Sequence, residues 1–336
     1  MSNLTFNIMS GNSQGLTNDA LILSEALNEI YGESTYTRHF SGSASKLKNA
    51  TLLMRLLVDK YLRRNRQITF HLEEIYQEVA PFSDENIFIP NQEWLRSGTL
   101  QAITPNIHIW CKTRYAVERL SHLTNNIHYV GFCSRDMYDG AIEKKPNSFI
   151  HIAGKSEQKG TQAILNIWQK NPQWPTVTIL SRNPAHKAYQ SENIDIIDKF
   201  VAEDELKRLM NSHQIHLCPS ESEGFGHNIV EALSTGALLM VTDAPPMNEL
   251  VPKDANYFIK VKSKSERYLS ELFYVDEEDF SDKVNNILSC NDELGKSISK
   301  TNKLHYHHLK TSFGSALTTQ KVFTPTNKLT DNTGEQ

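Results

Sequence analysis

The sequence lacks the features that mark secreted, membrane-spanning and zinc-binding proteins. Its four cysteines, Cys111, Cys133, Cys218 and Cys290, form neither a CxxC pair nor the spacing of a zinc site. Because Cys111 and Cys218 fall within apparent strands, we expect reduced thiols in the core. The N-terminus has no signal-peptide pattern, and no apolar run is long enough to span a bilayer. We therefore expect a cytoplasmic protein, either free or peripheral at a membrane, with no integral membrane segment.

Strong net charge and a dinucleotide fingerprint are absent as well. The formal net charge is −4, so the chain as a whole does not attract nucleic acid or an anionic membrane. The glycine-bearing loop 10–15, which follows the first apparent strand, does not have the GxGxxG pattern, and a dinucleotide site there is poorly supported. No cluster of metal ligands stands out, since the acidic run 276–279 matches the charge preference of a helix N-terminus. We expect neither a metal nor a permanently bound cofactor.

What the sequence contains is a regular alternation of short apolar strands and helical segments. Its 336 residues, 39% hydrophobic and 22% charged, are enough for two globular domains. The alternation predicts an α/β fold with parallel sheets covered by helices on both faces. A polar stretch, 132–147, predicts a linker, and the polar tail from residue 324 predicts disorder. The expected strands cover residues 4–9, 67–71, 86–90, 106–110, 127–131, 148–153, 176–180, 194–200, 215–218, 238–241 and 257–261.

A helix predicted over residues 49–64 ends in a group of basic residues, Lys60, Arg63, Arg64 and Arg66. Cations at a helix C-terminus offset the helix dipole, which is a purely structural explanation. The functional alternative is a basic patch that faces an anionic acceptor, such as a lipid head group, a nucleic acid or a phosphorylated sugar.

Polar side chains follow several strands of the first half. Ligands of parallel α/β sheets bind at the carboxyl ends of the strands, so these side chains are site candidates. They are His71, the group Asn91–Trp94, and Lys112. A single histidine such as His71 is also commonly a packed or capping residue.

The stretch 220–233 has the strongest functional pattern in the chain. It follows the apolar strand 215–218, and glycines on both sides of Phe225 allow a ligand to approach the backbone. With Asn228 as the expected N-cap, the following helix presents N–H groups and a positive dipole end, which suit a phosphate. Glu223 and Glu231 bracket this point with seven residues between them, and carboxylates there suit neutral hydroxyls. The stretch predicts a nucleotide-sugar site.

A structural explanation competes with this one. Asn228 and Glu231 have the spacing of a capping box, in which Glu231 does no more than satisfy a backbone N–H group. The loop 154–160, with Lys155 and Lys159, follows another expected strand and offers two cations for an anionic ligand.

Taken together, these segments resemble the retaining GT-B glycosyltransferases of family 4. The resemblance rests on the loop 154–160, the Pro219-Ser220 step, the Glu223 to Glu231 run and the segment 242–251. It is clear over residues 148–252 and only architectural over 1–131. It implies a GT-B fold, in which two Rossmann-like domains face each other across a cleft. The implied domains are 1–145 for the acceptor and 146–300 for the nucleotide-sugar donor, with a C-terminal helix, 301–323, that can return to the first domain.

The resemblance also assigns roles to residues. Glu231 holds the nucleotide ribose, Glu223 lies by the donor sugar hydroxyls, and Lys155 and Lys159 neutralise the diphosphate. Family members commonly carry a histidine where this chain has Asn91-Gln92-Glu93, so the acceptor-side catalytic candidates are Glu93 and His71. The catalytic candidates are thus Glu223, Lys155, Lys159, Glu93 and His71. The further donor-binding candidates are Gly15, Phe200, Val201, Gly224, Phe225, Gly226, His227 and Asn228.

The function implied is transfer of a sugar from a nucleotide sugar, most simply a UDP- or GDP-sugar, with retention and without metal. The acceptor stays open among a saccharide, a lipid-linked sugar, a nucleic acid and a protein. Two alternatives also stay open. One is a sugar-nucleotide epimerase of the same architecture, and the other is a non-catalytic nucleotide-sugar-binding protein.

Overall fold

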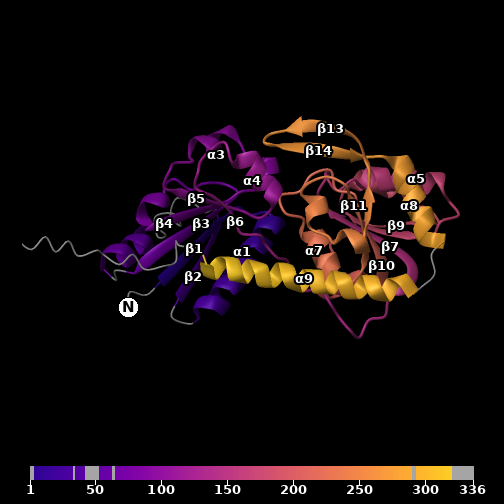
Figure 1. The fold of residues 1–336 in the computed structure, drawn as a ribbon, viewed down its shortest axis with the longest axis horizontal. Helices are drawn as coiled ribbons and strands as arrows, with labels where there is room; N and C mark the ends of the chain where they lie inside the picture. Colours follow the sequence, from indigo (N-terminus) through magenta and orange to yellow (C-terminus); the bar gives the residue numbers. More distant parts are fainter. Residues whose placement is uncertain (1–3, 33–34, 42–52, 63–64, 290–292, 320–336) are drawn as a thin grey trace, which may run out of the picture.

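The computed structural model describes residues 4–32, 35–41, 53–62, 65–289 and 293–319. Two six-stranded sheets stand side by side, and one long helix runs along both (Figure 1). Arg63, Arg64, Cys290 and the tail predicted to be disordered lie outside the described residues. Within the described residues, no helix combines the length and apolarity needed to cross a membrane.

The first sheet has the strand order β2-β1-β3-β4-β5-β6, and neighbouring strands are parallel. The central strands β1 and β3 are buried on both faces beyond their first residues, although apolar and polar residues alternate in both sequences. Their buried polar side chains have partners of their own, as where Asn7 Nδ2 donates to Gln67 Oε1 at 3.1 Å. Its strands are β1 (Leu4–Ser10), β2 (Thr35–Ser41), β3 (Arg66–Leu72), β4 (Glu85–Ile89), β5 (Ile107–Cys111) and β6 (Ile127–Tyr129). The helices of this half include α1 (Gln14–Tyr31), α3 (Ser97–Gln101), α4 (Arg114–Leu120) and the short helices η1 (Val58–Leu62) and η3 (Gln92–Trp94).

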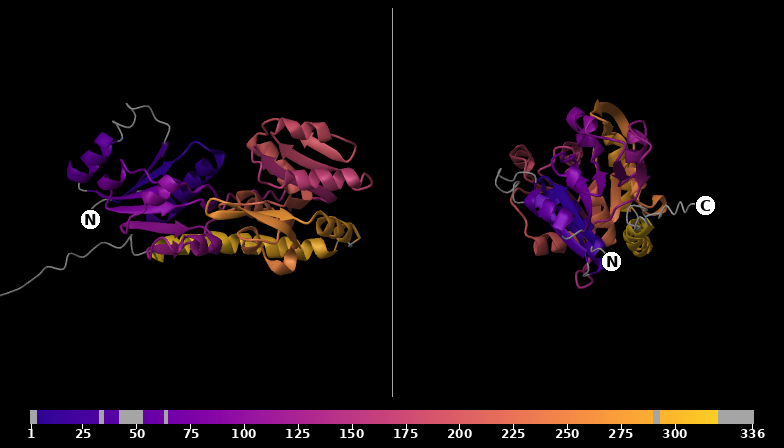
Figure 2. Two further views of the ribbon diagram at one scale, coloured as in Figure 1. Left: turned by 90° about the horizontal axis from the view of Figure 1, so that it is seen from above. Right: turned by 90° about the vertical axis from the view of Figure 1, so that its left-hand side faces the viewer.

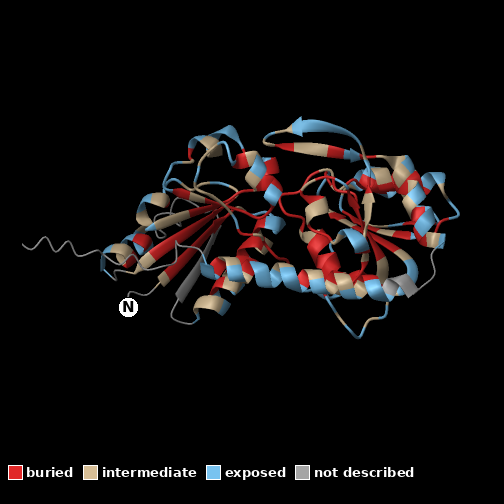
Figure 3. Cartoon of the chain, viewed as in Figure 1, coloured by how far each residue is buried: buried red, intermediate tan, exposed pale blue. Residues whose placement is uncertain are grey.

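The second sheet has the order β12-β11-β10-β7-β8-β9 and is also parallel. This is the doubly wound order, in which the chain direction across the sheet reverses between β7 and β10. Its strands are β7 (Lys145–Gly154), β8 (Val177–Ser181), β9 (Ile194–Ile197), β10 (His213–Cys218), β11 (Leu238–Thr242) and β12 (Tyr257–Ile259). Its helices are α5 (Thr161–Lys170), α6 (Glu203–Ser212), α7 (His227–Ser234) and α8 (Glu277–Ser289). Figure 3 shows burial concentrated along the strands of both sheets and in the loops between the two halves.

The two halves are joined by residues 130–144 and by helix α9 (Glu293–Thr319), which Figures 1 and 2 show alongside both. The stretch predicted as a linker, 132–147, is polar in composition, but Phe132 and Met137 within it are each 2% exposed. Phe132 packs on Phe313 of α9, with ring centroids 4.7 Å apart. Near the end of α9, the Tyr31 hydroxyl of the first half donates to the Leu317 carbonyl at 3.1 Å.

The basic group near residue 60 has structural partners where the structure describes it. Lys60 donates to the carbonyl of Pro81 at 3.0 Å. Arg66 opens strand β3 instead of ending a helix, and its guanidinium lies 3.2 Å from the Glu85 carboxylate. The two described members of the predicted patch therefore have local roles in the fold.

Sequence reasoning missed a β-hairpin, β13 (Val261–Arg267) and β14 (Ser270–Val275), that extends from the second half toward the first (Figure 1). Its tip contacts both halves. The Arg119 guanidinium of α4 donates to the Leu269 carbonyl at 2.8 Å, and the Ser270 hydroxyl lies 3.3 Å from that of Ser222. The hairpin therefore helps to fix the spacing of the two sheets.

Candidate active site

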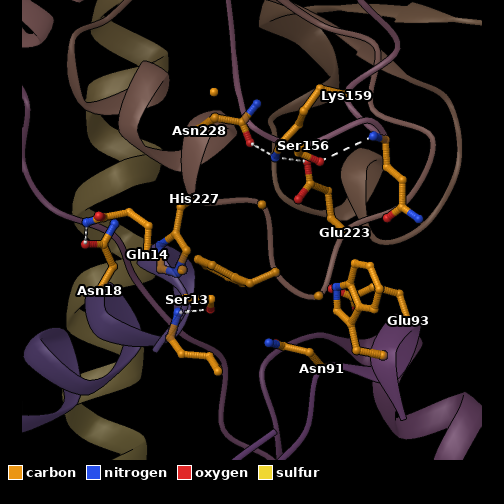
Figure 4. A pocket seen from close by; sticks show the side chains of 18 of the residues that line it. Ser13, Gln14, Asn18, Asn91, Glu93, Ser156, Lys159, Glu223, His227 and Asn228 are labelled. Carbon is orange, nitrogen blue, oxygen red and sulfur yellow. Dashed lines mark hydrogen bonds and ion pairs between the residues drawn. The ribbon is translucent and has the colours of Figure 1, made fainter. Parts of the chain in front are cut away.

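A cavity of about 860 Å³ lies between the two halves at the carboxyl ends of both sheets (Figure 4). Loops after β1, β3, β4 and β5 line one side of it, and loops after β7, β8 and β10 line the other. A smaller cavity of about 260 Å³ adjoins it, because Gly154, Arg182 and Glu231 line both. Ligands of doubly wound sheets bind at this edge, and the combined space suits a small-molecule substrate.

Helix α7 begins at the cavity wall. Its N-cap is Gly226, at a φ of 109° that favours glycine, and no side chain caps the helix. The prediction that Asn228 is the N-cap, in a capping box with Glu231, is therefore wrong. The first helical hydrogen bonds, from Ile229 and Val230, both go to the Gly226 carbonyl, so the preceding N–H groups are outside the helical ladder. The positive end of the helix dipole thus faces the cavity.

Cations and acids meet beside this helix. Lys159 Nζ lies 2.5 Å from Glu223 Oε1 and 2.9 Å from Asn228 Oδ1 (Figure 4). Its charge is therefore already balanced by Glu223. Lys155 is exposed and lines the larger cavity, and Arg182, at the end of β8, lines both cavities. Among the described residues, neither Lys155 nor Arg182 has a side-chain hydrogen bond or ion pair, so both can meet an anion.

Glu231 lies at the junction of the two cavities and is 8% exposed. Burial raises the pKa of its carboxyl, while the charges of His227 and Arg135 act in the opposite direction. Arg135 Nε lies 3.6 Å from Glu231 Oε1, and its terminal nitrogen lies 2.9 Å from Glu203. Sequence reasoning missed both Arg135, which lies in the linker, and Arg182.

The remaining donor-side candidates fall into two groups. Phe200, which is 73% exposed, and Val201 line the smaller cavity. Both lie in the loop after β9, because that strand ends three residues earlier than predicted. Gly15 lines the larger cavity from the first turn of α1. Phe225 also borders the larger cavity, but its ring is 3% exposed and packs on Phe132 at a centroid distance of 5.5 Å. The structure therefore brings all of these residues to one edge, although Phe225 serves mainly as packing.

A buried charge cluster spans the two halves behind this edge. In Asp19 of α1, Oδ2 lies 2.8 Å from Lys112 Nζ and Oδ1 lies 2.8 Å from His227 Nε2. His227 Nδ1 lies 2.8 Å from the Ser134 hydroxyl. Burial alone would raise the pKa of Asp19, but the Lys112 charge and the His227 hydrogen bond outweigh it and lower that pKa to about 2. The cluster holds His227 at the start of α7 in one orientation.

On the opposite side of the cavity, the loop after β4 contacts the loop between β10 and α7. Gln92 Nε2 donates to the Glu223 carbonyl at 2.7 Å. A Cβ at Gly224 would lie 2.5 Å from Asn91 Oδ1 and 2.7 Å from Glu93 Oε1, so only glycine fits without a shift. Figure 4 shows Asn91 and Glu93 across the cavity from Lys159 and Asn228.

Glu93 is 6% exposed and lines the cavity. Burial raises the pKa of its carboxyl to about 8, with the charges of Glu223 and Glu73 adding to the effect and that of Lys112 opposing it. Glu73, at the end of β3, accepts a hydrogen bond from Asn91 Nδ2 at 3.2 Å. Glu93 is therefore held mainly as a neutral acid at pH 7.

His71 does not reach the cavity. Its side chain is fully buried, its ring lies 2.9 Å from Asn86 Oδ1, and it accepts a hydrogen bond from the Tyr76 amide at 3.2 Å. Burial lowers the pKa of the ring to about 4, so the ring stays neutral. The expectation that His71 lies on the rim is wrong, and we withdraw it as a catalytic candidate.

Several solved structures share this architecture. A glycosyltransferase from Rickettsia africae has a TM-score of 0.68 at 12% identity, covering 95% of this chain and 100% of its own. Sucrose-phosphate synthase from Thermosynechococcus elongatus has a TM-score of 0.67 at 9% identity, with coverages of 94% and 97%. HepE from Anabaena, solved in complex with UDP, has a TM-score of 0.54 at 12% identity, with coverages of 94% and 98%. Such identities show the fold alone, and the predicted GT-B fold is confirmed.

A match between the sequence and a family profile identifies the family. The profile of the family "Glycosyl transferases group 1" matches residues 135–305, just over half of the chain. The chain belongs to this family, and the protein is a glycosyltransferase. None of the curated protein sequences matches the chain.

Proposed function

We propose that this glycosyltransferase uses a UDP- or GDP-sugar as donor and transfers the sugar with retention of configuration, without a metal ion. The supporting observation is the order of chemistry along the cavities. Exposed Phe200 lines only the smaller cavity, and Glu231 and Arg182 line both cavities. Lys155, Glu223 and Glu93 line only the larger one. That order matches the base, ribose, diphosphate and sugar of a donor. The UDP bound to HepE, a protein of the same fold, is consistent with it.

The proposed chemistry follows from charge. When the sugar leaves, negative charge grows on the diphosphate, and a preorganised positive site stabilises that charge. Lys155, Arg182 and the N-terminus of α7 supply it on our account, while Lys159 positions Glu223 through the 2.5 Å contact. Glu231 binds the ribose hydroxyls. Residues 1–145 would then form the acceptor domain and 146–300 the donor domain, with 301–323 as the helix that returns to the first domain.

The experiment is a donor panel. The full-length protein is incubated with UDP-, GDP- and ADP-sugars, with and without chelator, and released nucleoside diphosphate is measured. We expect slow donor hydrolysis without acceptor, unchanged by the chelator. Failure to bind any nucleotide or nucleotide sugar would overturn the proposal, and an inverted anomeric product would overturn retention.

The epimerase alternative predicts a changed sugar still attached to its nucleotide, which mass and NMR analysis of the product detects. The non-catalytic alternative draws on Asn91-Gln92-Glu93, where family members commonly carry a histidine. It predicts tight donor binding without transfer to any fraction of a cell extract. The acceptor itself, whether saccharide, lipid-linked sugar, nucleic acid or protein, is identified by the fraction that takes up a labelled donor sugar.

A further inference from the structure

The helical segment 53–62, which ends in η1, exposes large apolar side chains to solvent. Of the twelve large hydrophobic side chains that are exposed in the described part of the chain, four lie in this segment. They are Met54, Leu57, Tyr61 and Leu62, which we call the outer face. The first three follow at spacings of three and four residues, so they share one side of the helix. Single exposed apolar residues are ordinary, but such a group marks an interaction surface.

Packing within the fold accounts only for the opposite side of the segment. Leu56 is fully buried, and with Leu53 it packs against Met9 of β1 and against Val79. These contacts fix the segment to the first half of the protein. The segment is therefore apolar on two sides, of which the described fold uses one.

The charges beside the outer face are positive. Arg55 is exposed and, among the described residues, has no side-chain hydrogen bond or ion pair. The contact of Lys60 is with the carbonyl oxygen of Pro81, a neutral group, and leaves its charge unbalanced. Asp59, the acid of this segment, is 1% exposed and offers no charge to a partner at the surface. A partner of the outer face therefore meets cations beside apolar side chains.

The sequence around the segment has the same bias. The whole chain has a formal net charge of −4, yet the stretch 46–64 has one acid and six basic residues. The basic residues are Lys46, Lys48, Arg55, Lys60, Arg63 and Arg64. A local excess of cations on an acidic protein predicts an anionic partner.

We propose that the outer face and Arg55 dock on the surface of an anionic lipid bilayer. A bilayer supplies both complements at once, since its acyl region takes apolar side chains and its phosphates meet the cations. A nucleic acid offers phosphates but no apolar layer. The ten residues are too few to span the bilayer, so the helix would lie in its surface. The inference is independent of the proposed donor, because none of these residues lines either cavity.

Co-sedimentation of the full-length protein with vesicles tests the proposal. Vesicles of equal parts phosphatidylglycerol and phosphatidylcholine supply the anionic surface, and phosphatidylcholine vesicles are the neutral comparison. We expect at least about tenfold tighter binding to the anionic vesicles at low salt, with most of that difference lost at high salt. Equal binding to both kinds of vesicle, or binding to neither, would overturn the proposal.

A double variant tests the outer face itself. Met54→Gln/Leu62→Gln should bind the anionic vesicles about tenfold more weakly, because two apolar side chains no longer leave water. Leu21→Gln/Leu304→Gln is the matched control, since it replaces two exposed leucines on α1 and α9. We expect its vesicle affinity to stay within about twofold of the unaltered protein. An equal loss in both double variants would refute docking through the outer face.

A single variant tests the charge. Arg55→Gln should weaken binding to the anionic vesicles about fivefold, as expected for one basic residue at an anionic surface. Lys253→Gln is the control, because Lys253 is exposed in the second half and lines neither cavity. Undiminished vesicle binding by Arg55→Gln would contradict the assigned role of this residue.

Other partners give different results. A dimer of the unaltered protein that Met54→Gln/Leu62→Gln converts to a monomer would make a second copy the partner and overturn the proposal. Binding of an oligonucleotide that Arg55→Gln abolishes, without vesicle binding, would overturn it as well. If a thermal melt shows the double variant to be unfolded, hydrogen–deuterium exchange of the unaltered protein decides. Anionic vesicles should then protect amides in residues 53–62, and no protection there would refute the inference.

Discussion

Replacing Glu231 with Gln separates a ligand-binding role from a structural one. The side chain is 8% exposed, no capping box involves it, and its nearest charged partner is Arg135 at 3.6 Å. Gln keeps the size of the side chain and one acceptor oxygen but removes the negative charge. Arg135 retains the shorter contact, 2.9 Å, to Glu203. We therefore expect the melting temperature of the free protein to change little.

Nucleotide affinity should change strongly. If Glu231 accepts hydrogen bonds from two ribose hydroxyls, loss of its charge weakens charge-assisted hydrogen bonds worth about 1–3 kcal/mol. That corresponds to a roughly ten- to hundredfold rise in Kd for UDP or GDP. Calorimetry with the nucleoside diphosphate and a thermal melt of each variant are sufficient.

Glu203→Gln is the matched control for Glu231→Gln. It removes the closer carboxylate from Arg135 but leaves Glu231 in place, and the Glu203 side chain is 68% exposed. We expect its nucleotide affinity to stay within about threefold of the unaltered protein, since exposed ion pairs contribute little. Unchanged affinity in Glu231→Gln, or an equal loss in both variants, would refute a direct contact between Glu231 and the ribose.

Three further predictions concern stability. Gly160→Ala should lower the free energy of unfolding by more than the roughly 1–2 kcal/mol that a left-handed alanine costs, because the new Cβ would also meet the Pro219 carbonyl oxygen at 2.0 Å. Gly154 has a similar φ but open space around it, so Gly154→Ala should show only the conformational cost in the same denaturant titration. Asp19→Asn should cost about 3–5 kcal/mol by leaving buried Lys112 unpaired, and a melt no lower than that of the unaltered protein would contradict this. Between pH 4.5, the ordinary pKa of the group, and about pH 8, Glu93 binds a proton in the folded state but loses it on unfolding, so stability should fall as pH rises through that range. Glu93→Gln should therefore flatten the profile of melting temperature against pH.

Much of the architecture was predictable because the strands of a parallel sheet are short apolar runs between helices. The predictions failed where that signal is weak. Strand β2 (Thr35–Ser41) is largely polar in sequence, and the exposed hairpin strand β13 is rich in charged residues. The linker has polar composition, yet Phe132 and Met137 bury their side chains against the rest of the protein.

The candidate site was predictable where it lies within one segment, as in the run from Glu223 to Glu231. It was not predictable where it depends on contacts between distant segments. Asp19 and His227 are 208 positions apart and meet only because the two sheets face each other. The start of α7 was misplaced because Gly226, in a left-handed conformation, takes the position expected for a polar N-cap.

The central claim is that a nucleotide sugar binds between the two sheets, with its diphosphate at the loop after β7 and the start of α7. Hydrogen–deuterium exchange of the full-length protein, with and without UDP or GDP at saturation, tests this directly. We predict protection of amides in residues 10–19 of the first half together with 153–160 and 224–231 of the second, because those segments line the cavity. Protection confined to other segments, or no protection by either nucleotide, would contradict the account.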